Sequence, residues 1–230
     1  MYYCVLKDCF WLRPQVFDNL IAAGEMPVTI GVFVNPGMRD GRSRDIYQRS
    51  VEYDTVSEVH ASFLEKDILP LVEEHCMISA DPSRRAICGA SSGGIAAFSA
   101  AWFRPDLFGR VVSHIGSFTN IRGGHNFPAI IRHTPRKPLV KVYLQSGEFD
   151  IDNVHGSWPL ANKAMFAALA FAGYDTKLEF GEGTHSVAHG GAVLPETLRW
   201  LWAEGSGEPA TGSVKATTAT VTSGGGIARL

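Results

Sequence analysis

The sequence predicts an α/β fold in which a mostly parallel central sheet carries helices on both faces. Short apolar and β-branched runs alternate along the chain with longer segments whose apolar residues recur at helical spacing. Such alternation is typical of parallel strands joined by crossover helices. With 230 residues, the chain is long enough to form one large domain with a substantial core.

Six short runs are expected to form the strands of this sheet. They are rich in β-branched or other apolar residues, and most end at a turn that contains glycine or proline. The expected strands are residues 4–6, 28–34, 85–88, 111–115, 139–144 and 177–180.

The segments between these runs are expected to form helices, one of them kinked by Pro70. The expected helices are residues 14–23, 60–75, 95–103, 160–172 and 194–202. The polar stretch 38–57 is rich in arginine and aspartate and is expected to be a loop. Its arginines, including Arg49, are therefore expected on a solvated face rather than against an acidic substrate.

Composition argues against several classes of function. The formal net charge of −2 gives no electrostatic reason to expect nucleic acid, and no apolar run reaches membrane-spanning length. The four cysteines show no disulfide-framework spacing, and neither CxxC nor HExxH occurs, so we expect no metal site. Residues 1–8 lack the segments of a signal peptide, which makes the cytoplasm the default location.

The segment 86–95 predicts a strand, a tight turn and a helix. Its Gly89–Gly93 part fits the G-x-S-x-G pattern of a nucleophile elbow, in which a strained turn exposes the serine Oγ at the top of the sheet. Side chains in place of the two glycines are expected to collide with the neighbouring strand and helix. The N–H of Ser92 can point at an oxyanion from the helix N-terminus. The pattern alone also fits a plain turn, but its context favours the elbow.

Three strand ends carry reactive side chains, namely Ser91, Asp150 and His185. The carboxyl ends of parallel strands meet at one edge of the sheet, where ligands bind. The order serine, acid, histidine along the chain is that of α/β-hydrolases. This order makes the prediction much more specific than the elbow alone.

Several segments carry a family resemblance: Val16–Ile21, Val32–Gly37, Cys88–Gly94, Arg104–Phe108, Gly116–Phe118, Trp158–Asn162 and His189–Gly191. In them the chain resembles the enterochelin-esterase-like putative esterase family of α/β-hydrolases. That family includes siderophore, feruloyl and acetyl-xylan esterases and mycolyltransferases. The resemblance spans about four fifths of the chain.

The resemblance implies that Ser91 is the nucleophile, Asp150 the acid and His185 the general base. Serine needs an imidazole to take its proton, and the imidazole needs a carboxylate to fix its tautomer. Asp152 and Glu148 remain alternatives to Asp150, because either can reach from the same loop.

His189 is an alternative to His185 as the base, but it is better explained as a residue that supports the site or caps the last helix. Trp158 can be a wall of the pocket or a buried aromatic anchor. His114 and His155 lie near expected strand ends, where each can line the pocket.

The chain departs from the family at its N-terminus. Family members carry two further strands before this region, so the N-terminal strands are shortened or missing. They also carry an Asp-Gly turn whose N–H completes the oxyanion hole. The nearest match here is Asp8-Cys9, so the Cys9 N–H is the expected second donor. Loss of one donor typically costs about 3–4 kcal/mol of transition-state stabilisation.

The strand order of the family would leave the 28–34 strand at a sheet edge, and an apolar edge strand is a template for pairing. We therefore expect a homodimer or an aggregation-prone monomer. A monodisperse monomer with this strand covered by residues 1–12 would count against this expectation.

Two functions follow from these observations. The first is a serine carboxyl-ester hydrolase without a cofactor. Its substrate is a small-molecule or carbohydrate ester: an acylated carbohydrate, a feruloyl-type ester or a siderophore lactone. Acyl transfer to an alcohol would use the same triad. The second is a non-catalytic or truncated relative that acts in binding or assembly.

The expected domain covers residues 1–204. Residues 205–230 are rich in glycine, serine, threonine and alanine and are expected to be a disordered tail. Relatives are often secreted, so secretion is the alternative location if the start of the chain has lost its signal.

Overall fold

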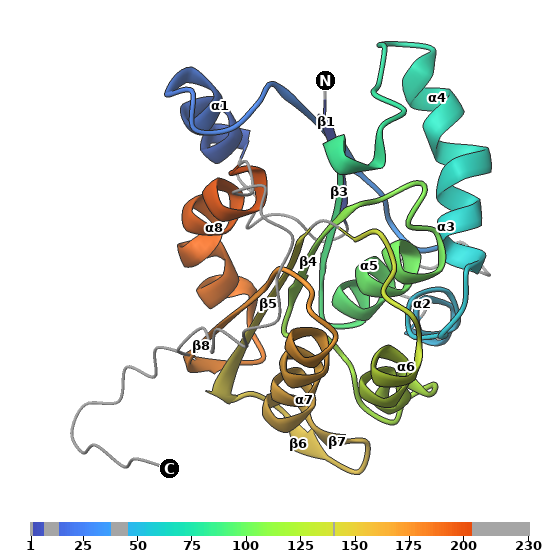
Figure 1. Ribbon diagram of the computed structural model, residues 1–230, viewed down its shortest axis with the longest axis vertical. Helices are drawn as coiled ribbons and strands as arrows, with labels where there is room; N and C mark the ends of the chain where they lie inside the picture. The colour runs from blue at the N-terminus through green and yellow to red at the C-terminus, as the bar shows by residue number, and fades with distance from the viewer. Residues whose placement is uncertain (1, 7–13, 38–45, 140, 204–230) are drawn as a thin grey trace.

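The computed structural model describes residues 2–6, 14–37, 46–139 and 141–203. These residues form an α/β fold with a six-stranded parallel sheet in the order β2-β1-β3-β4-β5-β8 (Figure 1). The strands are β1 (Tyr2–Leu6), β2 (Thr29–Phe33), β3 (Arg85–Ala90), β4 (Arg110–His114), β5 (Lys141–Phe149) and β8 (Thr176–Thr184). The predicted fold class is thereby confirmed. A small antiparallel pair, β6 (Asp152–Asn153) and β7 (Gly156–Ser157), follows β5.

Helices cover both faces of the sheet, as Figure 1 shows. On one face, α1 (Pro14–Ala22) and α8 (Val187–Trp202) pack around a core that includes Leu20, Cys88 and Leu198. The larger core lies on the opposite face. Its helices are α2 (Ile46–Tyr53), α3 (Val59–Phe63), α4 (Leu69–Glu73), α5 (Ser92–Phe103), α6 (Phe127–His133) and α7 (Trp158–Phe171).

Helix α5 begins directly after the G-x-S-x-G turn and is buried on nearly all sides. A helix of alanine and large apolar residues is stable in such a position because it presents no polar face. Phe98 packs edge-to-face against Phe118 and Phe127. The N-terminus of α5 is therefore held rigidly at the carboxyl ends of β3 and β4.

The expected loop at 38–57 is wrong for its second half, because residues 46–53 form helix α2. The polar composition hid this helix, which packs against α5 and anchors itself through buried Tyr53. The Tyr53 hydroxyl donates to the carbonyl of Val34 (3.2 Å). Residues 38–45 lie outside the described residues.

Two helices differ from the prediction, the first because of a proline and the second because of a capping serine. The 60–75 helix changes into a π-helical turn over Leu64–Ile68, where the Leu69 N–H donates to the Leu64 carbonyl. The wider turn relieves the clash between Pro70 and the preceding turn. The last helix begins at Val187 rather than at 194, because Ser186 caps it by accepting from the Ala188 N–H (3.1 Å).

Strand β2 lies at one edge of the described sheet and pairs only with β1. It is half-buried, and Phe33 is 52% exposed. No helix among the described residues is long and apolar enough to cross a membrane. The expected disordered tail at 205–230 lies outside the described residues.

Candidate active site

Ser91 occupies the sharp turn between β3 and α5, with φ 57° and ψ −120°. Non-glycine residues rarely adopt a positive φ, and they do so at strained sites that the surroundings enforce. Here the Ser91 N–H donates to the His114 carbonyl (2.9 Å), and the Ser91 carbonyl accepts from the Ser117 N–H (3.1 Å). The turn is thus tied to β4 and to the loop that follows it.

The two glycines of the turn are not equivalent. A Cβ on Gly89 would lie 2.1 Å from the Gly93 carbonyl oxygen, so a side chain there is excluded. A Cβ on Gly93 would meet nothing within 4 Å, and the expected collision at that position is therefore wrong. The role of Gly93 lies in its backbone atoms, which pack directly against Gly89.

A continuous set of hydrogen bonds joins Ser91, His185 and Asp150. His185 Nε2 lies 2.8 Å from Ser91 Oγ, and His185 Nδ1 lies 2.5 Å from Asp150 Oδ1. Asp150 is buried and also accepts from the Ser146 hydroxyl (3.1 Å) and the Ile151 N–H (2.7 Å). These bonds hold the carboxylate in a fixed orientation beneath the imidazole.

A register shift between β5 and β8 lies at Gly147 and Phe149, directly before Asp150. A Cβ on Gly147 would lie 2.0 Å from the Gly183 carbonyl oxygen, so the two strands approach more closely than side chains allow. Such irregularities change the direction in which the following side chains point. The alternative acids point elsewhere: Glu148 is exposed on β5, and Asp152 is exposed on β6.

His189 lies within α8 and is not in contact with Ser91. Its Nδ1 is 3.1 Å from Gln145 Nε2, and its ring packs where Cβ atoms on Gly181 and Gly183 would stand. The next residue, Gly190, lies so close to buried His114 that a Cβ there would be 1.9 Å from His114 Nδ1. The contacts of His189 and Gly190 with Gln145, His114 and the glycines of β8 pack α8 closely against the sheet.

The donor and the acceptor of each hydrogen bond around Ser91 follow from the groups involved. The Trp158 indole N–H can only donate, and it donates to Ser117 Oγ (3.2 Å). With Asp150 ionised, His185 Nδ1 carries the proton of that contact, and Nε2 accepts the Ser91 proton. The Ser117 hydroxyl, 3.3 Å from Ser91 Oγ, is then the donor to Ser91.

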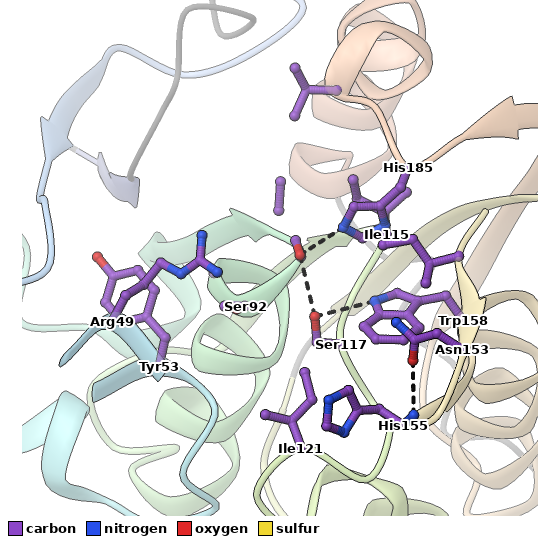
Figure 2. Close-up of a pocket in the computed structure, with 15 residues that line it drawn as sticks. Arg49, Tyr53, Ser92, Ile115, Ser117, Ile121, Asn153, His155, Trp158 and His185 are labelled. Atoms are coloured by element: carbon purple, nitrogen blue, oxygen red, sulfur yellow. Dashed lines mark hydrogen bonds between the residues drawn. The ribbon is translucent and has the colours of Figure 1, made fainter. Parts of the chain in front are cut away.

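A cavity of about 490 Å³ opens beside Ser91 (Figure 2). Trp158 is both a wall of the cavity and a buried aromatic anchor, as the sequence suggested. It is 3% exposed, lines the cavity, and packs edge-on against the His185 ring. His155 also lines the cavity, whereas His114, the last residue of β4, is fully buried and is not part of the lining. The remaining wall is mainly apolar, with Ile115, Ile121, Ile151 and Val187, and its polar members include Arg49, Tyr53 and Asn153.

Of the two predicted oxyanion donors, the structure describes Ser92. Ser92 is the first residue of α5 and lines the cavity next to Ser91, so its N–H lies at the positive end of the helix. Cys9 lies outside the described residues. No group of three or more histidine, cysteine or acidic side chains within the described ranges could hold a metal ion.

Sequence reasoning missed Asp54 and Ser117. It expected Arg49 on a solvated face, and this was wrong, because Arg49 lies on helix α2 and lines the cavity. Asp54 is 2% exposed and within hydrogen-bonding reach of the Ser50 and Ser92 side chains. Burial raises the pKa of Asp54 above its ordinary value, although these hydrogen bonds and the charges of Arg49 and Arg122 oppose the rise. Ser117 belongs to a segment that carries the family resemblance, and that was the available signal.

The model of a family described as "Putative esterase" matches residues 11–201. The iron(III) enterobactin esterase of Dickeya dadantii (strain 3937) is 26% identical over 195 residues, which are 78% of this chain and 42% of that protein. The chain therefore spans about two fifths of this curated relative.

Solved structures of several esterases are similar to this fold. A ferulic acid esterase superposes with a TM-score of 0.68 at 18% identity, covering 87% of this chain and 84% of that one. The enterochelin esterase of Shigella flexneri gives 0.70 at 21% identity, covering 88% and 51%. An S-formylglutathione hydrolase from Agrobacterium tumefaciens gives 0.61 at 13% identity, covering 86% and 82%. These likenesses identify the α/β-hydrolase fold.

Proposed function

Because the chain belongs to the putative esterase family, we propose that it is a serine carboxyl-ester hydrolase that forms an acyl-enzyme on Ser91. The observation that carries the proposal is the unbroken hydrogen-bonded series from Ser91 through His185 to Asp150. It combines a hydroxyl on a strained turn, facing the cavity, with an imidazole whose tautomer is set by a buried carboxylate.

In the first half of the reaction, Ser91 Oγ attacks the ester carbonyl while its proton passes to His185 Nε2. The carbonyl oxygen becomes an oxyanion, which the Ser92 N–H can stabilise at the α5 N-terminus. Asp150 accepts from Nδ1 and stabilises the imidazolium. His185 then donates its proton to the departing alkoxide, and the alcohol leaves.

In the second half, a water molecule gives a proton to His185 and attacks the acyl carbon. The bond to Ser91 Oγ breaks, and His185 returns the proton to that oxygen. The Ser117 hydroxyl donates to the same oxygen, so it can share the charge that develops there. The products are the free acid and the regenerated enzyme.

The similarity to an iron(III) enterobactin esterase supports a siderophore-type lactone as the first substrate to test. Feruloyl-type and carbohydrate esters come next, since a ferulic acid esterase shares the fold.

The test is hydrolysis of 4-nitrophenyl acetate and butyrate by the wild type and by Ser91→Ala. We expect turnover by the wild type and its loss in the variant, because the acyl-enzyme needs the Ser91 hydroxyl. A fluorophosphonate probe should label the wild type alone. A folded wild type that neither turns over nor labels would contradict the proposal and favour a non-catalytic relative.

A further inference from the structure

The cavity beside Ser91 has one residue with a permanent charge among the described residues that line it, namely Arg49. Figure 2 shows its guanidinium directed from α2 toward the cavity. The described lining contains no aspartate or glutamate, and most of it is apolar. The wall next to the nucleophile is therefore positively charged.

Within the described part of the chain, Arg49 forms no contact ion pair, and the carboxyl of Asp54 acts on it only through charge. Its Nε is buried and has no hydrogen-bond partner among the described residues. The nearby carboxyl of Asp54 is directed to Ser50 and Ser92, and it also faces the charge of Arg122. An enclosed, unpaired N–H on a charged group is costly, so it requires an explanation.

We propose that Arg49 is a binding subsite for an anionic oxygen group of the ester, so that the substrate carries a carboxylate or phenolate near its scissile bond. This proposal rests on the proposed function, because it concerns the substrate of the same cavity. The planar guanidinium can hold two oxygens side by side, and an apolar wall strengthens such a pair. A neutral ester would leave the guanidinium unpaired.

The test compares matched esters with and without a carboxylate. For the acyl side, the pair is 4-nitrophenyl 4-carboxybenzoate and 4-nitrophenyl 4-methylbenzoate. For the alcohol side, it is 4-acetoxybenzoate and 4-methylphenyl acetate. In Arg49→Gln, kcat/KM for one or both carboxylates should fall at least about tenfold. Values for the neutral partners should change little, and the arm that responds identifies which side of the ester contacts Arg49.

Two further variants separate the contact from its alternatives. Arg49→Lys keeps the charge and should retain part of the preference. Arg122→Gln removes an arginine that hydrogen-bonds to Ser50 and does not line the cavity, so it should leave the preference unchanged. An equal loss in Arg122→Gln, or no selective loss in Arg49→Gln, would overturn the subsite.

Binding of terephthalate, measured by calorimetry, tests the subsite without turnover. Binding that weakens in Arg49→Gln supports the proposal, and equal binding to both proteins overturns it. If the wild type hydrolyses no ester at all but binds terephthalate through Arg49, the proposed function fails and the anion subsite stands.

Discussion

Ser117 Oγ lies 3.3 Å from Ser91 Oγ and is oriented by the Trp158 indole, which donates to it. The Ser117 hydroxyl thus gives Ser91 a hydrogen bond in addition to the one that Ser91 makes with His185. This contact joins two loops 26 residues apart, at the ends of adjacent strands.

Ser117→Ala should slow release of the acyl group more than its formation, because the lost donor faces the oxygen that leaves in deacylation. We expect kcat for 4-nitrophenyl acetate to fall about tenfold, as for loss of a hydrogen bond to a charged group. Stopped-flow measurement should show a larger burst of nitrophenolate. Trp158→Phe, which removes the orienting N–H together with part of the buried ring, should also enlarge the burst. An unchanged burst and kcat in Ser117→Ala would contradict this role.

Asp150→Asn should lower kcat on the order of 10⁴-fold, because an amide cannot hold His185 in the required tautomer. Asp152→Asn is the matched control, since Asp152 is exposed on β6 and makes no contact with His185. Steady-state kinetics with 4-nitrophenyl acetate separate the two. A large loss in Asp152→Asn with an active Asp150→Asn would reverse the assignment.

His114 should make the protein less stable as the pH falls. It is fully buried against Tyr143, with His189 beside it, and burial lowers its pKa to about 3. The unfolded chain takes up the proton near pH 6.5, but the folded protein does not. The free energy of unfolding should therefore decrease from about pH 6.5 downward, by up to about 1.4 kcal/mol per pH unit from this residue.

Urea unfolding at several pH values between 7.5 and 5 measures that slope. His114→Gln cannot titrate, so its slope should be shallower than that of the wild type by about this amount. Equal slopes would show that His114 is protonated or solvated in the folded protein.

The open edge of β2 predicts self-association of the protein. We expect sedimentation velocity to show a dimer or larger species, because the outer edge of β2, which no described strand pairs, lies next to the exposed Phe33 and can pair with a second copy. Phe33→Lys should shift the distribution toward the monomer. Phe171→Lys changes an exposed phenylalanine on α7, far from this edge in the sheet order, and should have no such effect. A wild type that stays monomeric at high concentration would contradict the prediction.

The sequence by itself determined the architecture and the elbow, because both depend on local patterns. Strand and helix periodicity predicted each strand of the sheet, and the glycine spacing around Ser91 predicted the strand–turn–helix. Local composition failed where packing overrides it. Helix α2 looked like a polar loop, yet it is held by contacts with α5.

The sequence named Ser91, Asp150 and His185 but left alternatives to the acid and the histidine, and only the tertiary structure decided between them. Asp150 and Asp152 are equivalent by composition, and the shift between β5 and β8 brings Asp150 to the imidazole. His185 and His189 differ because α8 begins between them and carries His189 into its own packing. Arg49 reaches the cavity because helix α2 packs beside it, and Ser117 because its loop bonds to the turn at Ser91. Both placements depend on contacts between residues far apart in the chain, so no local sequence pattern predicts them.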